Sequence, residues 1–155
     1  MILALDLGTN CGWAMLRDED IVRSGVWDLA LEEDQADGHR FLRLWQLLTK
    51  AHGEQALELV AFERSMVKKG AHAVEIYAGL KAITEAFCAA RSVRCVSVHT
   101  GTLKKHITGS GRAEKPAMRD VAQQRWGRRI DGFDEADALC VLSWAVDQLQ
   151  TQGAA

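Results

Sequence analysis

The sequence predicts an α/β protein in which helices flank a five-stranded mixed sheet. Short apolar runs near the N-terminus follow one another across tight turns, and two further apolar runs come later in the chain. Stretches with helical spacing of apolar residues separate and follow these later runs. The 155 residues, 48% of them hydrophobic, are enough for one domain over residues 1–155 with a buried core.

Five strands are expected, at Ile2–Leu7, Cys11–Arg17, Asp20–Leu29, Leu57–Glu63 and Val93–Val98. Only short turns join the first three, which predicts an antiparallel meander. Gly25 is expected to form a bulge in the third strand.

Five helices are expected, at Gln35–His52, Ala71–Ala90, Gly101–Ile107, Pro116–Trp126 and Asp134–Leu149. Phe41, Leu44 and Leu48 follow helical spacing in the first of them. A proline is tolerated in the first turn of the fourth. No internal repeat or low-complexity tract interrupts this order, so the sequence predicts no domain boundary.

Composition narrows the classes of protein that remain. Apolar runs are too short to span a membrane, and the N-terminus lacks the pattern of a signal peptide, so we expect a cytoplasmic protein with no membrane partner. The four cysteines form no CxxC pair and the five histidines show no metal-binding spacing. Zinc ligation and a disulfide framework are therefore not predicted.

The charge distribution is uneven. The net charge is −2, yet eight of the 19 Lys and Arg residues lie between Lys104 and Arg129, with only Glu114 and Asp120 among them. Such a local basic field suits a phosphate backbone, although a charge run alone also fits a solvated helical face.

Four acidic residues stand at the ends of predicted elements. Asp6 lies in the first strand and Glu63 ends the fourth, and the two strands could be neighbours in a mixed sheet. Asp134 and Asp137 are three residues apart in the first turn of the last helix and so face the same side. Each has an ordinary alternative, because Asp6 could cap its turn, Glu63 could pair with Arg64, and the two helix acids could serve the helix terminus.

A cluster of four carboxylates repels itself unless cations relieve it. Mg²⁺ prefers such hard oxygen ligands. Two ions about 3.5–4 Å apart would clamp the attacking water and the leaving oxygen of a phosphodiester. The pattern therefore predicts metal-dependent phosphodiester chemistry.

Four segments carry a resemblance to a known family. LALDLGTNCGWA, LVAFERS, LKKHITGSGRAEK and DEADALCVLSWA occur in the order and approximate spacing of the RuvC family of Holliday-junction resolvases. The resemblance covers nearly the whole chain, and the short, divergent sequence resembles phage-type members. It implies the RNase H-like fold and Mg²⁺- or Mn²⁺-dependent, symmetric nicking of four-way and branched DNA by a homodimer. It leaves open the cleavage sequence and the need for a helicase partner.

The resemblance also implies roles for individual residues. The metal-binding, catalytic acids of the family correspond to Asp6, Glu63, Asp134 and Asp137, and its basic residues near the scissile phosphate to Lys104 and Lys115. Family members can carry an aromatic wedge shortly after the catalytic Glu, where this chain has Met66 with Lys68 and Lys69 close by. The complete set of expected DNA contacts is Met66, Lys68, Lys69, Lys104, Lys105, Arg112 and Lys115. The helix Ala71–Ala90, with small residues at Ala78, Gly79 and Ala82, is the expected dimer seam, although a core-facing helix would look similar.

Three other hypotheses remain open at this point. The opening segment also resembles the first phosphate loop of the actin, Hsp70 and sugar-kinase superfamily, although those folds need two such domains. A nuclease of the same fold with another specificity, such as one for RNA–DNA hybrids, is the nearest competitor. A catalytically inactive DNA-binding or scaffolding module is the third.

Overall fold

The sheet is five-stranded and mixed, as the sequence predicts. The structure is a computed structural model that describes residues 1–18, 21–64 and 70–153. The strands are β1 (Ile2–Asp6), β2 (Asn10–Arg17), β3 (Ile21–Asp28), β4 (Leu59–Arg64) and β5 (Arg94–His99). Their order in the sheet is β3-β2-β1-β4-β5, with β3, β2 and β1 antiparallel and β1, β4 and β5 parallel.

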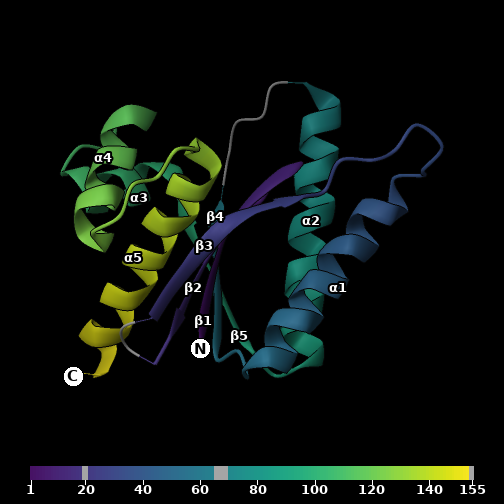
Figure 1. The fold of residues 1–155 in the computed structure, drawn as a ribbon, viewed down its shortest axis with the longest axis horizontal. Helices are drawn as coiled ribbons and strands as arrows, with labels where there is room; N and C mark the ends of the chain where they lie inside the picture. The colour runs from purple at the N-terminus through teal and green to yellow at the C-terminus, as the bar shows by residue number, and fades with distance from the viewer. Residues whose placement is uncertain (19–20, 65–69, 154–155) are drawn as a thin grey trace.

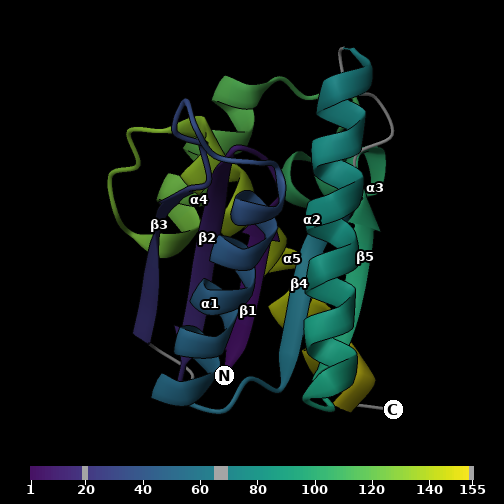
Figure 2. The same ribbon diagram turned by 90° about the vertical axis from the view of Figure 1, so that its right-hand side faces the viewer.

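Helices cover both faces of this sheet (Figure 1). The helices are α1 (Gly38–Glu54), α2 (Ala71–Ala90), α3 (Thr100–Thr108), α4 (Lys115–Trp126) and α5 (Phe133–Gly153). Figure 2 shows α1 and α2 side by side in front of the sheet, whereas α3, α4 and α5 lie behind it. The fold is therefore a three-layer arrangement with the sheet in the middle.

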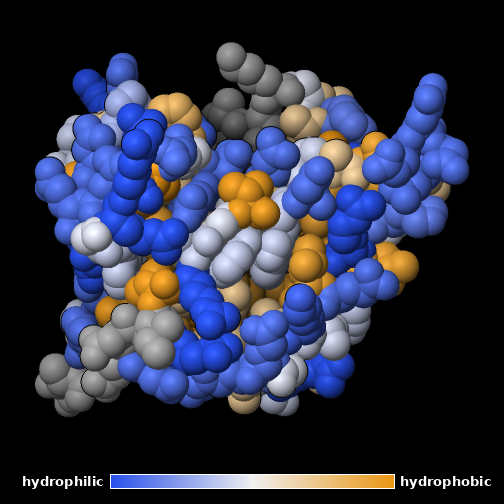
Figure 3. Space-filling view, in the orientation of Figure 1, coloured by the Kyte–Doolittle hydropathy of each residue, from blue (hydrophilic) through white to orange (hydrophobic). Residues whose placement is uncertain are grey.

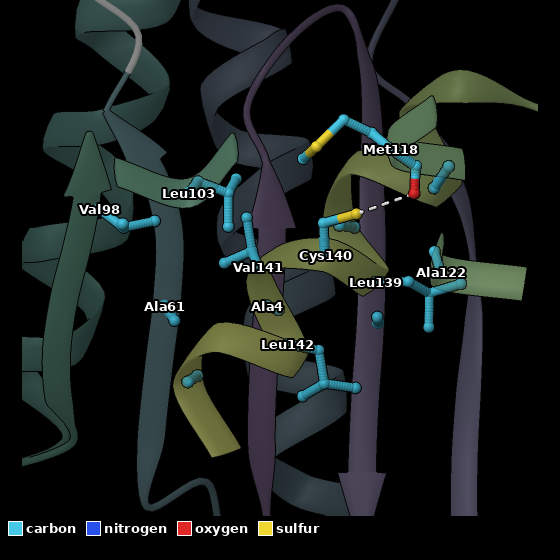
Figure 4. Close-up of a cluster of buried hydrophobic side chains, with 14 of the residues drawn as sticks. Ala4, Ala61, Val98, Leu103, Met118, Ala122, Leu139, Cys140, Val141 and Leu142 are labelled. Carbon is cyan, nitrogen blue, oxygen red and sulfur yellow. Dashed lines mark hydrogen bonds between the residues drawn. The ribbon is translucent and has the colours of Figure 1, made fainter. Parts of the chain in front are cut away.

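Alternation along the strands divides the core between the two faces. Leu3 and Leu5 of β1 pack with Leu44 and Leu48 of α1 in one cluster. The intervening Ala4 belongs to the other cluster, against α5. Figure 4 shows small side chains on the strands beneath this helix, which lets α5 lie close to the sheet.

The expected bulge at Gly25 is wrong. Pairing between β2 and β3 continues without a skipped residue, and Gly25 lies opposite Trp13. A Cβ atom on Gly25 would lie 3.2 Å from the Trp13 indole, which stacks on Trp27 with ring centroids 5.7 Å apart. The glycine therefore leaves room for a large ring rather than bending the strand.

Element boundaries follow the prediction closely. Residues Ala71–Ala90 form one helix as expected, while α5 continues beyond Leu149 to Gly153.

None of the described helices has the length and apolar character needed to cross a bilayer. Figure 3 shows mainly hydrophilic side chains on the face seen in Figure 1, with apolar atoms in small separate groups.

Gly79 belongs to the contact between α1 and α2 rather than to a free helix face. A Cβ atom on Gly79 would lie 2.3 Å from the Phe41 ring of α1. The expectation that Gly79 contributes to a dimer seam is therefore wrong, because its small size is used within the chain.

We predict that Gly79→Ala lowers the free energy of unfolding by about 1–3 kcal/mol, because Phe41 must move to admit the methyl group. Gly53→Ala is the matched control. Gly53 lies on α1, and a Cβ atom there would have no other atom within 4 Å. The control should be neutral or slightly stabilised. Urea unfolding measures both, and equal stabilities for the two variants would contradict the close contact.

Candidate active site

Two acidic residues lie side by side at the carboxyl ends of parallel strands. Leu5 of β1 pairs with Phe62 of β4, and Asp6 and Glu63 are the next residues along each strand. Neighbouring strands are about 4.8 Å apart. Because Ala4 and Ala61 face α5, the residues two positions further, Asp6 and Glu63, face α5 as well. Strands β1 and β4 are therefore neighbours in the sheet, as the sequence predicts.

The start of α5 rests directly on the backbone of β2. Gly12, which pairs with Asp6, lies so close to the helix that a Cβ atom would be 1.9 Å from the carbonyl oxygen of Asp134. Only a residue without a side chain fits this contact. The first turn of α5, with Asp134 and Asp137, is thereby placed over the ends of β1 and β2.

Glu135 fixes this end of α5 from the outer side. Its Oε1 accepts hydrogen bonds from Ser24 Oγ of β3 at 2.6 Å and from Arg128 Nη2 at 3.2 Å. These bonds tie the first turn of α5 to the sheet edge and to the segment after α4. The rotation of the helix, and so the direction of Asp134 and Asp137, is held on both sides.

The four carboxylates surround one cavity of about 410 Å³. All six residues that the sequence predicts as catalytic line it: Asp6, Glu63, Lys104, Lys115, Asp134 and Asp137. Of the other expected DNA contacts, Lys105 and Arg112 are exposed outside the cavity. Met66, Lys68 and Lys69 lie outside the described residues.

Burial and the clustering of negative charge raise the pKa values of two of these carboxyl groups. Burial, together with the charges of Asp137, Glu63 and Asp134, raises the pKa of Asp6 to about 7. Burial also raises the pKa of Asp137 above its ordinary value, despite a hydrogen bond from Lys115 Nζ at 2.9 Å. Burial works to lower the pKa of Lys115, but Asp137, Asp6 and Asp134 raise it overall. Lys115 is thus a firmly charged partner inside the carboxylate cluster.

Glu63 is positioned by groups that the sequence analysis missed. Thr100, the first residue of α3, donates its hydroxyl to Glu63 Oε1 in a short hydrogen bond. Tyr77 of α2 donates its hydroxyl to the Glu63 carbonyl oxygen at 3.1 Å. Both contacts depend on distances between elements, so no local pattern could reveal them.

Arg40 is a second residue without a sequence signal. It lies on α1, only 5% exposed, and its Nη1 donates to Thr9 Oγ1 at 2.9 Å. Thr9 belongs to the turn after Asp6 and lines the cavity. Within the described residues Arg40 forms no ion pair, and its Nε is buried without a hydrogen-bond partner. A guanidinium from the opposite face of the sheet therefore supports the turn beside the carboxylates.

The donor set fits a hard divalent cation in chemistry. Carboxylate oxygens surround the cavity, and their mutual repulsion is what a divalent charge would relieve. In the described part of the chain, however, no three acidic, histidine or cysteine side chains are arranged to hold an ion. Lys115 and Thr100 engage Asp137 and Glu63 instead. Metal binding at this cavity would require these side chains to exchange partners.

The sheet order, the parallel pair β1–β4 and the helix laid across the sheet define the RNase H-like fold. No protein-family model matches the chain, and no curated protein sequence matches it either. Its likeness to known proteins therefore lies in structure.

Solved structures that resemble this chain include Holliday-junction resolvases. Thermus thermophilus RuvC in complex with a Holliday-junction substrate aligns with a TM-score of 0.75 and 14% identity, over 90% of this chain and 88% of that chain. The yeast mitochondrial Holliday-junction resolvase Ydc2 aligns with a TM-score of 0.63 and 14% identity, over 90% of this chain and 75% of that chain. The fowlpox virus resolvase with its junction DNA aligns with a TM-score of 0.56 and 15% identity, over 93% and 97%. At these identities the likeness shows the fold.

The raised pKa of Asp6 predicts a pH-dependent stability of the metal-free protein. The folded protein keeps a proton on Asp6 up to about pH 7, whereas the ordinary pKa is 3.8. Between these values the folded state binds more protons than the unfolded state, so the free energy of unfolding falls as pH rises and stays low above pH 7. Asp6→Asn should therefore stabilise the protein at pH 8, by on the order of 1–4 kcal/mol, and have little effect near pH 4.

Thermal melting in EDTA across this pH range tests the prediction. Asp34→Asn, at an exposed loop carboxylate, is the control and should change the melting temperature equally at every pH. If the melting temperatures of the wild type and Asp6→Asn change in parallel with pH, the pKa of Asp6 is not raised in the folded protein.

Proposed function

We propose that this protein is a single-domain, divalent-metal-dependent endonuclease that cuts four-way and related branched DNA by paired, symmetric nicks made by a homodimer. The observation that carries the proposal is the convergence of Asp6, Glu63, Asp134 and Asp137 on one cavity that two lysines also line. The fold shared with three junction resolvases supports it.

The carboxylates would hold the metal, and the lysines would meet the DNA. Asp6, Glu63, Asp134 and Asp137 would be the ligands of Mg²⁺ or Mn²⁺, with two ions in each site. When bound, such ions supply an activated water and stabilise the leaving oxygen. Within the described residues Lys104 has no ion pair, so its ammonium is available for a phosphate oxygen at the cavity.

Lys115 has a different part, because it already holds Asp137. Burial raises the pKa of the Asp137 carboxyl above its ordinary value, and the Lys115 ammonium works against that rise. Once the carboxylates have other partners, its ammonium would be free to offset the charge that grows on the scissile phosphate. Lys115 would therefore serve the empty site and the reacting site in turn.

The basic field between Lys104 and Arg129 divides into paired and free cations. Four of its members form ion pairs with acids of the chain: Lys115 with Asp137, Arg125 with Asp147, Arg128 with Glu135 and Arg129 with Asp131. The other four form none with any described residue: Lys104, Lys105, Arg112 and Arg119. These free cations would contact the phosphate backbone and give a slightly acidic protein its affinity for DNA.

A homodimer would supply the second active site. Two nicks related by a twofold axis need two sets of carboxylates, and the chain provides one. Helix α2 presents Val74, Ala78 and Ala82 to solvent at four-residue spacing, with Val74 50% exposed. This small, apolar stripe is the proposed seam, while Gly79 and Tyr77 face their own chain.

We predict that Asp6→Asn and Glu63→Gln each reduce cleavage of a four-way junction at least about 100-fold while leaving junction binding nearly unchanged. Each change removes metal-binding charge and leaves the free cations in place. Asp131→Asn is the control, because this carboxylate is 81% exposed and lies outside the cavity. It should cleave like the wild type.

The substrate panel decides between the candidate functions. Four-way, three-way and linear DNA and an RNA–DNA hybrid are incubated with Mg²⁺, with Mn²⁺ and with EDTA. The proposal is supported if the protein makes paired nicks in the four-way junction, whether or not it also cuts the three-way DNA. Preferred cutting of the hybrid indicates the nuclease of other specificity, and nucleotide binding without cleavage indicates the phosphate-loop alternative. Near-normal turnover in either acid variant would overturn the carboxylate site.

We predict that Ala78→Glu produces a monomer, because the charge would be buried at the proposed seam without a partner. Sedimentation should show the loss of the dimer, and the monomer should make single rather than paired nicks. Ala56→Glu, an exposed residue between α1 and β4, is the control and should remain dimeric. A wild-type monomer that still makes paired nicks would exclude the dimer.

A further inference from the structure

An exposed aromatic ring stands beside the carboxylate cavity. Phe133 is the first residue of α5 and directly precedes Asp134. It is 38% exposed, and it is the only aromatic residue among the large hydrophobic side chains that the described chain leaves exposed. Asp134 lines the cavity and Phe133 does not, so the ring lies at the outer side of the site.

Two cations of α4 face this ring. The Cζ atom of Arg119 lies 5.0 Å from the ring centroid, and the Nζ atom of Lys115 lies 5.8 Å from it. Both distances are within the range of cation–π contacts. Lys115 also donates to Asp137 at 2.9 Å. One continuous cluster therefore joins the ring to the carboxylates.

Arg119 differs from the arginines that follow it. Arg125, Arg128 and Arg129 each pair with an acid, whereas Arg119 pairs with no acid in the part of the chain that the structure describes. Its Nε is also buried without a hydrogen-bond partner. The ring and the guanidinium thus lie together, the ring still partly open to solvent and the guanidinium without an ion pair to any described acid.

Open aromatic rings with adjacent cations are suited to nucleotides. A base stacks on the ring whatever its identity, and a guanidinium beside it binds the phosphate. At a branch point of DNA, bases lose a stacking neighbour, so moving one onto a protein ring costs less there than within a continuous duplex. A protein that must bring a phosphate to the adjacent carboxylates would gain from holding the neighbouring base.

We propose that Phe133 and Arg119 bind one unstacked nucleotide of a branched DNA next to the scissile phosphate, with the base on the ring and its phosphate at the guanidinium. The proposal rests on the proposed function, since it names a contact made by the same substrate. It assigns a binding role to a residue that the sequence analysis did not single out.

The test compares junctions with and without the base. In the Asp6→Asn background, which prevents cleavage, binding is measured for a four-way junction and for the same junction with an abasic nucleotide at each position around the nick. Phe133→Ala should weaken binding of the intact junction about 5- to 100-fold. At one abasic position the wild-type and Phe133→Ala proteins should bind the junction equally, because no base remains to stack. Phe133→Trp should keep the affinity, and Phe133→Leu should keep only part of it.

A fluorescent base gives an independent readout. 2-Aminopurine at the same position should brighten when the Phe133-containing protein binds and should remain quenched with Phe133→Ala. Leu42→Ala is the matched control, because Leu42 is 54% exposed on α1, on the other side of the sheet. It should change neither affinity nor fluorescence. Melting temperatures identify any variant that is poorly folded, and Phe133→Leu then replaces Phe133→Ala.

The nucleotide site and the nuclease activity are disproved by different results. If Phe133→Ala binds and brightens the junction like the wild type, or loses the same affinity on every abasic junction, the nucleotide site is overturned and the nuclease stands. If the protein with Asp6 intact cuts no branched DNA, the proposed function fails and the nucleotide site falls with it.

Discussion

The carboxylate site depends on one close approach, that of the first turn of α5 to the β2 backbone at Gly12. Because a Cβ atom there would lie 1.9 Å from the Asp134 carbonyl oxygen, any other residue would push the helix away from the sheet. Asp6 and Glu63 are fixed by strand register, but Asp134 and Asp137 reach them only if α5 lies this low. A shift of about 1 Å is enough to impair chemistry that requires aligned groups. The glycine in β2 is thus a requirement of the site more than of the strand.

Gathering four carboxylates costs stability in the metal-free protein, and the chain offsets only part of the cost. The pKa of Asp6, raised to about 7 by burial and by its acidic neighbours, reflects this strain. Lys115 and Thr100 each satisfy one carboxylate, through Asp137 and Glu63. If each of the four carboxylates had a strong internal partner, the site would be more stable, and a divalent cation would relieve little repulsion there. The incomplete compensation is the kind of trade between stability and activity that functional sites show.

The fold and the acids could be predicted because their signals are local. Strand alternation and helical spacing place Asp6, Glu63 and the pair three residues apart on α5 without knowledge of the rest of the chain. Gly25 misled the prediction, because a glycine that makes room for Trp13 looks the same in sequence as one that forms a bulge. Arg40 and Thr100 act across elements, at distances that only the folded chain defines, so no spacing in the sequence could reveal them.

The far face of the sheet takes part in the site through the two strand ends that carry acids. Tyr77 of α2 bonds to the carbonyl oxygen of Glu63, and Arg40 of α1 bonds to Thr9 just after Asp6. Burying a guanidinium with few partners costs free energy, so core packing alone does not explain Arg40 at this position. Since α5 supplies the remaining acids from the other side, the sheet ends are held from both faces. The α1–α2 layer is therefore joined directly to the two strand ends, by Tyr77 at Glu63 and by Arg40 at the turn after Asp6.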